Sequence, residues 1–404
     1  MRILSLQSGT SADGIDAAIV QFTAAGDDPR RPELTLRQIA AETVDWAPEL
    51  RRDLLAFADG AALDAGALTR LTTAAGRAFA AAAADLCARF GPVDLVVSHG
   101  QTVYHWVEDG HARGTLQLGE AAWIAEAVGA PVLSNLRAAD IAAGGEGAPL
   151  MGIFDRAWFG DNVPAASLNL GGIANLQIVL ASGEILAFDT GPANVLIDAA
   201  IARSSGGSLG YDPDGSHAAA GTVHDGVLSA LLAHPYLARP APKSTGRETF
   251  TLDVVDAALA ASGARDLGLS DLLATLTRYS AVSVAGALHA AAPDLGLVIA
   301  SGGGVDNPTL LAELRAALPA GVELATSAEH GIDPGFKESL LFALIGYLSW
   351  HGLPLSLRAE NPRIAGVFSA GIAPLRLPEP LLGIAGLHIF SPDRNSHESE
   401  HRND

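Results

Sequence analysis

The sequence predicts an α/β fold built from two related half-domains, and three observations support this. Short apolar, β-branched runs alternate with longer helix-like runs throughout the 404 residues, which is typical of α/β proteins. A chain of this length is sufficient for two domains of ordinary size. Glycine-containing loops follow strand-like runs at corresponding positions of the two halves, near residues 9 and 171, and such recurrence indicates related units.

The first loop lies between strand-like runs at residues 3–7 and 15–22. Its small residues direct several backbone N–H groups into one concavity, an arrangement that binds phosphate, although an ordinary hairpin turn is the simpler alternative. No Gly-Lys-Ser/Thr follows and the loop leads into a strand, so it is not a Walker loop. The residues expected to hold a nucleotide here are Ser8, Gly9, Thr10, Ser11, Asp13 and Gly14.

The second loop joins expected strands at 166–170 and 175–180, and a third glycine cluster separates a strand at 297–300 from a helix at 308–318. This organisation resembles the actin, hexokinase and chaperone ATPase superfamily, whose half-domains hold a nucleotide between them. The half-domains are expected at 1–145 and 146–365, with a helix near the C-terminus crossing back and a C-terminal extension over 366–404 whose end is disordered. The nucleotide-binding residues expected here are Asn169, Gly171, Gly172, Gly302, Gly303, Gly304 and Asn307.

Charge and composition exclude several classes of partner. A formal charge of −20 argues against nucleic acid and acidic membranes, which require basic patches. The long apolar stretch at 281–300 is interrupted by His289 and Asp294, so no membrane span is expected. The single Cys87 and the direct entry of the N-terminus into a strand favour the cytoplasm. The polar segment His397–Asp404 is expected to be a solvated tail rather than a metal site.

A series of ordered motifs resembles the anhydro-N-acetylmuramic acid kinase family, a relative of levoglucosan kinase. The resemblance extends from about Ile3 to about Gly371 and implies an actin-like ATPase fold, ATP and Mg²⁺ as cofactors, and a homodimer. The motifs are Ser8–Asp16, Ser98–Thr102, Thr115–Gly119, Asp140–Leu150, Asn169–Asn175, Phe188–Asn194, Pro242–Glu248 and Gly302–Pro308.

The resemblance implies a reaction that opens a 1,6-anhydro sugar with water and phosphorylates its O6. Asp189 is the expected base, at the end of an apolar strand over 185–188, where catalytic groups of open sheets gather; the alternative is a helix cap. Asp13 and Glu338 are the expected Mg²⁺ ligands, since one or two carboxylates are sufficient for this ion. For Glu338, the alternative is a first-turn residue stabilised by the helix dipole.

The sugar is expected to contact polar residues from both halves. The family match implies this role for Glu120 and Arg137, and His99 and Gln101 are expected to orient the substrate. A Ser98–His99 hydrolase pair is excluded, because neighbouring strand residues point to opposite faces and no nucleophile elbow is present. The remaining expected substrate residues are Asn194, Lys243 and Arg247, the last two for closure of the cleft.

The chain departs from the family pattern at several positions beside these motifs. The changes near Asn135 leave a levoglucosan-type kinase or a non-catalytic nucleotide-binding sensor as alternatives to a kinase of 1,6-anhydro-N-acetylmuramic acid. None of them removes a proposed catalytic carboxylate. The departures are Gln7, Asn135, Leu136, Ala193, Pro334–Phe336, Ser339 and Phe368–Gly371.

Overall fold

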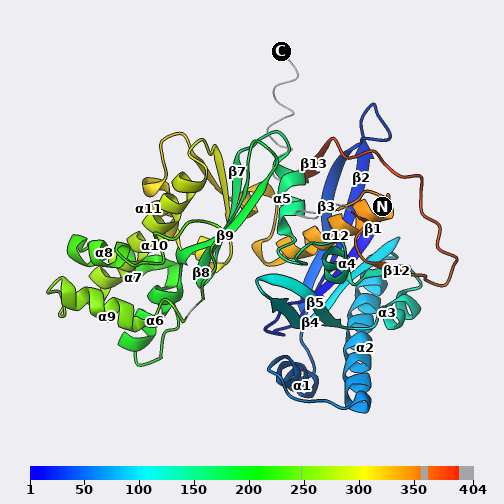
Figure 1. Cartoon of the computed structure of the whole chain (residues 1–404), viewed down its shortest axis with the longest axis horizontal. Coiled ribbons are helices and arrows are strands. Elements are labelled where there is room, and N and C mark those ends of the chain that lie inside the picture. Colours follow the sequence, from blue (N-terminus) through cyan, green and yellow to red (C-terminus); the bar gives the residue numbers. More distant parts are fainter. Residues whose placement is uncertain (247, 356–362, 391–404) are drawn as a thin grey trace. The chain divides into compact units, whose positions relative to one another are not determined.

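The computed structural model describes residues 1–246, 248–355 and 363–390, so Arg247 and the segment 391–404 lie outside the described residues. The chain forms two compact units (Figure 1). Unit 1 combines Met1–Gly160 with the residues from Gly331 onward, and unit 2 is Asp161–His330. The expected divisions were 145/146 and 365/366. Residues 146–160 and the helix at 337–350, both within the range expected for the second half-domain, instead group with unit 1. Both segments pack in one apolar cluster with strand residues such as Ile3.

Unit 1 contains an eight-stranded sheet. Strands β1 (Arg2–Ser8), β2 (Ile15–Ala25) and β3 (Glu33–Val44) form an antiparallel meander. Strand β4 (Leu95–Glu108) pairs parallel with β1, and β6 (Val132–Ser134) pairs parallel with β4. Strand β5 (His111–Leu118) folds back on β4 as a hairpin. The order β6-β4-β1-β2-β3 forms the centre of the sheet.

Unit 2 repeats this pattern in a five-stranded sheet of order β11-β10-β7-β8-β9. Strands β7 (Ala165–Leu170), β8 (Ile173–Val179) and β9 (Ile185–Pro192) form the antiparallel meander. Strand β10 (Leu297–Ser301) is parallel to β7, and β11 (Glu323–Thr326) is parallel to β10. The same order and the same strand directions in both units confirm the predicted fold of two related, actin-like half-domains.

Helices cover both faces of the unit 1 sheet. Successive β1 residues alternate between two apolar clusters: Leu4 packs with Phe79 of α2 (Ala65–Phe90), and Ile3 packs with Leu344 of α12 (Lys337–Trp350). This alternation follows from the two-residue period of a strand. The other helices of the unit are α1 (Pro48–Ala58), α3 (Ala121–Val128), α4 (Leu136–Ala142) and α5 (Met151–Phe159).

In unit 2, the long helix α10 (Leu269–Ala291) contributes to two apolar clusters. Val284 packs with sheet residues such as Leu168, and Leu276 packs with helical residues such as Ile201. The surrounding helices are α6 (Val195–Ser204), α7 (Ser216–Ala219), α8 (Asp225–Leu232), α9 (Leu252–Ala261) and α11 (Pro308–Ala317). Short 3-10 turns occur at η1 (Pro213–Gly215), η2 (Gly303–Asp306), η3 (Ala328–His330) and η4 (Pro334–Phe336).

The segment after α12 supplies an edge strand at each side of the unit 1 sheet. Strand β12 (Val367–Ser369) pairs antiparallel with β6, and β13 (Gly386–Ile389) pairs parallel with β3. Both outer strands of the sheet therefore gain a partner, which protects them from pairing with other chains. Within the described ranges, no helix combines the length and the apolar character that a membrane crossing requires.

Candidate active site

The β1–β2 loop of unit 1 is closed by side chains at its two ends. The hydroxyl of Ser8 donates to the carbonyl of Gly14 at 2.7 Å and accepts from the indole N–H of Trp46 at 3.1 Å. The N–H of Ala12 donates to the carbonyl of Gly9 at 3.0 Å. A side chain at Gly14 would overlap the methyl group of Thr43. Ser8 and Gly14 therefore determine the shape of the loop.

Asp13 lies exposed at the tip of this loop and forms an ion pair with Arg51 of α1 at 3.1 Å. The pKa of Asp13 is lowered, first by a hydrogen bond from Ser11 and then by Arg51. The guanidinium of Arg51 also donates to the carbonyl of Ala12 at 2.8 Å and to that of Ser11 at 3.3 Å. The expected metal ligand Asp13 thus has a cationic partner that motif reading missed.

Gln101 bonds to the loop, and the neighbouring His99 bonds to Arg137 inside unit 1. The amide of Gln101 donates to the carbonyl of Gly9 at 2.9 Å, so this residue supports the loop. Nε2 of His99 accepts from Nε of Arg137 at 2.7 Å, and Nδ1 lies 3.1 Å from the carbonyl of Gly100. These partners select the neutral tautomer protonated at Nδ1. Burial, followed by the charge of Arg137, lowers the pKa of His99 to about 3.

Arg137 itself is held by a loop that Asp140 shapes. Asp140 accepts from the N–H of Gly147 at 2.8 Å, and the carbonyl of Gly147 accepts from Nη1 of Arg137 at 2.7 Å. Burial lowers the pKa of Arg137, and the nearby charge of Glu338 opposes that effect. The guanidinium is therefore fixed by two acceptors, His99 and Gly147, on different elements.

His99 and Glu120, both expected near the sugar, line the same pocket, with a volume of about 70 Å³. The pocket is predominantly polar and lies where β4, β5, α3 and the start of α4 meet. Within the described residues, the buried hydroxyl of Ser98 has no hydrogen-bond partner. Such a group is available to a polar ligand. The pocket also includes Gly100, Gln117, Ser134 and Asn135.

Glu338 lies in the first turn of α12, exposed by surface area yet surrounded by protein atoms that desolvate its carboxylate. Desolvation raises the pKa of Glu338, Arg137 lowers it, and the carboxylate of Asp16 raises it further. Its neighbour Lys337 forms a buried ion pair with Asp155 of α5 at 2.9 Å. Glu338 therefore experiences the charges of both Arg137 and Asp16, at the start of a helix that the Lys337–Asp155 pair anchors. No cluster of three or more metal-ligating side chains occurs within the described part of the chain.

In unit 2, the third glycine cluster packs directly on the β7–β8 loop. Gly302 has a φ of +82° and lies so close to Asn169 and the backbone of Leu170 that a side chain would clash. Gly304 lies equally close to Leu170, whereas Gly303 faces open space. The expected nucleotide-binding glycines thus divide into two that permit close packing and one that leaves its surface free.

Asn194 and Asn307 both use their side chains within unit 2. The Asn194 amide donates to the carbonyls of Leu170 and Gly171 at 3.2 and 2.9 Å. The N–H of Val195 donates to the carbonyl of Gly172 at 3.0 Å. Asn307 accepts from the N–H of Leu310 at 2.9 Å and is the N-cap of α11. The structure thus gives Asn194 a loop-holding role and Asn307 a helix-capping role.

Asp189 lies inside β9 rather than at the end of a strand, because β9 continues to Pro192. It pairs with Asn175, and the next pair joins Gly191 to Ala174, so Thr190 forms a bulge. Bulges redirect neighbouring side chains and are frequent beside active sites. The carboxylate does not cap α6, since Oδ2 accepts from Ser244 Oγ at 3.0 Å and from Thr245 N–H at 2.9 Å.

Lys243 anchors the segment that holds Asp189. It is buried, and its ammonium donates to the carbonyls of Tyr236 and Leu237 at 3.2 and 3.0 Å. Its own carbonyl accepts from the N–H of Asp189 at 2.9 Å. The Tyr236 hydroxyl donates to the Asp189 carbonyl at 2.8 Å, and burial, followed by the Asp189 charge, raises the pKa of Tyr236 to about 12. Lys243 therefore holds the backbone beside Asp189, and its expected role in cleft closure stays a prediction.

Two departures from the family pattern contact each other. The buried amide of Gln7 donates to the hydroxyl of Ser339 at 3.4 Å, linking the end of β1 to the first turn of α12. The segment Pro334–Phe336 forms a short 3-10 turn that Asp333 caps through the N–H of Gly335 at 2.9 Å. These departures therefore change residues at and just before the first turn of α12, which carries Glu338, and leave Glu338 itself in place.

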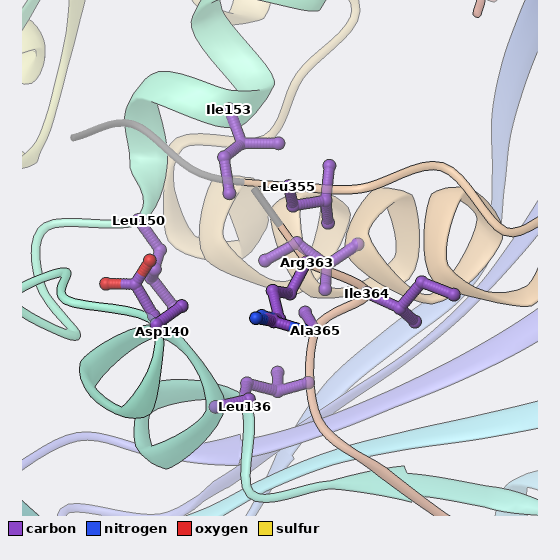
Figure 2. A pocket seen from close by; sticks show the side chains of 11 residues that line it. Leu136, Asp140, Leu150, Ile153, Leu355, Arg363, Ile364 and Ala365 are labelled. Atoms are coloured by element: carbon purple, nitrogen blue, oxygen red, sulfur yellow. The ribbon is translucent and has the colours of Figure 1, made fainter. Parts of the chain in front are cut away.

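Two further departures, Asn135 and Leu136, border two different cavities of unit 1. Asn135 adopts a left-handed backbone with φ of 55°, which asparagine and aspartate tolerate better than most residues. Leu136 is buried and borders a separate cavity of about 20 Å³, lined by apolar side chains together with Asp140 and Arg363 (Figure 2). This volume is sufficient for about one water molecule.

Comparison with known proteins identifies the family. The model for "Anhydro-N-acetylmuramic acid kinase" matches residues 1–368. A protein of that name from Streptomyces coelicolor is 46% identical over 94% of this chain and 96% of its own length. One from Rhodococcus erythropolis is 44% identical over 92% and 94%. A solved structure, the activator of the 2-hydroxyisocaproyl-CoA dehydratase from Clostridium difficile, covers 85% of this chain and 93% of its own with 14% identity and a TM-score of 0.39.

Proposed function

The chain belongs to the anhydro-N-acetylmuramic acid kinase family and is a kinase; we propose that it opens 1,6-anhydro-N-acetylmuramic acid with water and phosphorylates O6. The products are the sugar 6-phosphate and ADP, in the recycling of cell-wall material. The observation that carries the hydrolytic part is Asp189, whose Oδ2 is held by Ser244 and Thr245. An ordinary sugar kinase phosphorylates a free hydroxyl and does not break the anhydro bridge.

The proposed reaction couples two bond changes. Asp189 accepts a proton from water as the water oxygen bonds to C1, and the C1–O6 bond breaks. O6 takes that electron pair and attacks the γ-phosphorus of ATP, from which ADP leaves. Capture of O6 by the phosphoryl group removes the problem of a poor alkoxide leaving group. A positioned carboxylate base contributes about 10²–10⁴-fold to such a step.

The fixed geometry around Asp189 supports this role. The two hydrogen bonds to Oδ2, from Ser244 and Thr245, fix the orientation of the carboxylate. Because these bonds engage Oδ2, they leave Oδ1 to approach the water. The bulge at Thr190 and the anchored Lys243 segment hold the carboxylate from both sides. Positioning of this kind is a main source of catalytic rate.

In this proposal the glycine loops bind the phosphates of ATP, and the unit 1 pocket binds the sugar. The β1–β2 loop carries Thr10 and Ser11 at its exposed tip, and backbone N–H groups of such loops suit anions. Glu120 and the free hydroxyl of Ser98 supply polar contacts in the pocket. His99 acts through Arg137, because its ring nitrogen holds the guanidinium.

The carboxylates of unit 1 fit Mg²⁺. Glu338 and Asp16 are close enough for the charge of Asp16 to raise the pKa of Glu338, and a divalent cation relieves such repulsion. Mg²⁺ prefers carboxylate oxygens and keeps several waters, so a larger cluster is not required. We propose Glu338 and Asp13 as the residues that hold it, with Asp16 beside Glu338. When bound, the ion neutralises charge on the β- and γ-phosphates.

The test uses isotopically labelled water and two sugars. ATP consumption is measured with 1,6-anhydro-N-acetylmuramic acid and with levoglucosan side by side. In ¹⁸O-water, the proposal places the label at C1 at early times, before the free hemiacetal exchanges, while the ester oxygen remains the sugar's own O6. A product that keeps its anhydro bridge would refute the hydrolytic mechanism. Preference for levoglucosan supports the alternative substrate, and ATP binding without turnover supports a sensor. A cytoplasmic location and a homodimer stay predictions.

A further inference from the structure

We propose that Arg51 is a positioning residue of the kinase reaction, holding the β1–β2 loop in the shape that receives the phosphates of ATP. This inference rests on the proposed function and deepens it. Arg51 lies on α1, outside the glycine loops, and its guanidinium contacts three consecutive residues of the β1–β2 loop. Nε donates to the carbonyl of Ala12 at 2.8 Å, and Nη2 reaches Ser11 and Asp13 at 3.3 and 3.1 Å.

The backbone at Ala12 explains why the loop requires such support. Ala12 has a φ of +48°, a left-handed conformation that alanine adopts rarely. Its side chain is fully buried, and its N–H donates to the carbonyl of Gly9. The carbonyl of the same residue accepts from Arg51. The arginine therefore stabilises the strained residue through its backbone, and a planar guanidinium with fixed donors suits that task.

Charge gives Arg51 a second effect. The chain carries a net charge of −20, and the carboxylate of Asp13 lies at the tip of the loop proposed to bind an anionic nucleotide. Arg51 pairs with that carboxylate at 3.1 Å. The loop thus presents its N–H groups to phosphate with the charge of Asp13 partly offset. Loss of Arg51 removes the hydrogen bond to the Ala12 carbonyl and leaves the Asp13 carboxylate without its cationic partner.

The neighbouring Arg52 is a matched control. It lies on the same helix with a 70% exposed side chain, and the ion pair that it forms is with the adjacent Asp53. Arg51→Ala and Arg52→Ala therefore remove the same side chain from the same helix, and only the first disconnects the loop. Arg51→Lys keeps a charge beside Asp13 but cannot reproduce the fork of donors.

The experiment measures kinetics, MgATP affinity and thermal unfolding of the three variants. We expect Arg51→Ala to lower kcat/KM for MgATP by about 10–100-fold, the loss typical of a charged hydrogen-bonding group, with KM for the sugar nearly unchanged. Arg51→Lys should recover part of this loss, and added methylguanidinium should partly restore Arg51→Ala. Arg52→Ala should match the parent enzyme.

Two results would overturn the inference. The first is equal kcat/KM and equal MgATP affinity in the two alanine variants. The second is a lowered melting temperature for Arg51→Ala with unchanged kinetic constants, which shows a structural role alone. If the parent enzyme binds MgATP but turns over neither anhydro sugar, the proposed function fails. Weaker MgATP binding by Arg51→Ala than by Arg52→Ala then still supports the role of Arg51 at the phosphates.

Discussion

His99 makes the stability of unit 1 depend on pH in a way that one substitution removes. Burial and the charge of Arg137 lower its folded-state pKa to about 3, whereas an unfolded histidine titrates near about 6.5. Below that pH, the unfolded chain binds a proton that the folded chain does not. The free energy of unfolding therefore falls as the pH falls from about 6.5 toward about 3.

The pKa difference gives the size of this effect. Each pH unit inside the window changes the free energy of unfolding by about 1.4 kcal/mol, and the change between about pH 6 and pH 4.5 is about 2 kcal/mol. His99→Gln retains an oxygen that accepts from Arg137 and does not titrate. We expect the variant to be less stable at neutral pH and to lose about 2 kcal/mol less than the parent over that interval.

The tryptophans allow the two units to be followed separately. All five tryptophans lie in unit 1, so their fluorescence during urea unfolding reports that unit alone. Carboxylates that titrate in the same range affect the parent and the variant alike and cancel in the difference. His234→Gln is the control: burial lowers the pKa of His234, but this residue lies in unit 2. The tryptophans are Trp46, Trp106, Trp123, Trp158 and Trp350.

Equal pH dependence of the parent and His99→Gln would refute the reasoning. It would mean that His99 gains a proton in the folded state, so that its ring no longer accepts from Arg137. A parallel change in His234→Gln would show instead that the tryptophan signal does not isolate unit 1. Only a difference confined to His99→Gln supports the neutral acceptor described above.

Three further predictions concern the carboxylates and their support. Asp189→Asn should lower turnover by about 10²-fold or more with MgATP affinity retained, because an amide cannot accept the proton; turnover within about tenfold of the parent would remove Asp189 from the base role. Burial raises the pKa of Glu338 above its value in the unfolded chain, so the protein loses stability as the pH rises from that unfolded value through the raised pKa. Glu338→Gln removes this loss and should therefore raise the melting temperature at neutral pH without Mg²⁺. The same variant should weaken Mg²⁺ affinity by at least about 10-fold, and an unchanged Mg²⁺ response would leave Glu338 as a first-turn helix residue. Ser339→Ala should cost about 1–3 kcal/mol by leaving the buried Gln7 amide unpaired, while the double variant with Gln7→Leu should recover most of it; additive losses in this cycle would show that the two residues are uncoupled.

The fold was predictable because its signals are local and recur. The glycine loops, the strands beside them and the helix expected at 308–318 follow from turn residues and apolar periodicity. The extent of β9 was not predictable in the same way. Thr190-Gly191-Pro192 has the composition of a turn, yet it continues the strand. β9 is the edge strand of its sheet, where proline is tolerated.

The candidate site was predictable only in its glycines and carboxylates. Arg51 lies in a polar, helical stretch where an arginine resembles any solvated residue, and its contacts depend on how α1 packs beside the loop. The partners of Asp189 come from positions 236–245, more than forty residues away along the chain. Charge and motif spacing carry no information about such contacts. Gln7 and Ser339, separated by 332 positions, were visible as two independent departures but not as a pair.

The two related loops are held by different means, although the sheets that carry them share one topology. In unit 1 four side chains bond to the β1–β2 loop, those of Ser8, Trp46, Arg51 and Gln101, in addition to the close approach of Gly14 to Thr43. In unit 2 the β7–β8 loop is held by the Asn194 amide, by backbone N–H groups and by the close approach of Gly302 and Gly304. Side-chain support can be weakened one bond at a time, whereas close packing fails as soon as a Cβ is added. Substitutions of the side chains that hold the first loop, such as Arg51 and Gln101, should therefore give graded losses of MgATP affinity. Substitutions of Gly302 and Gly304 should instead disrupt the packing of unit 2.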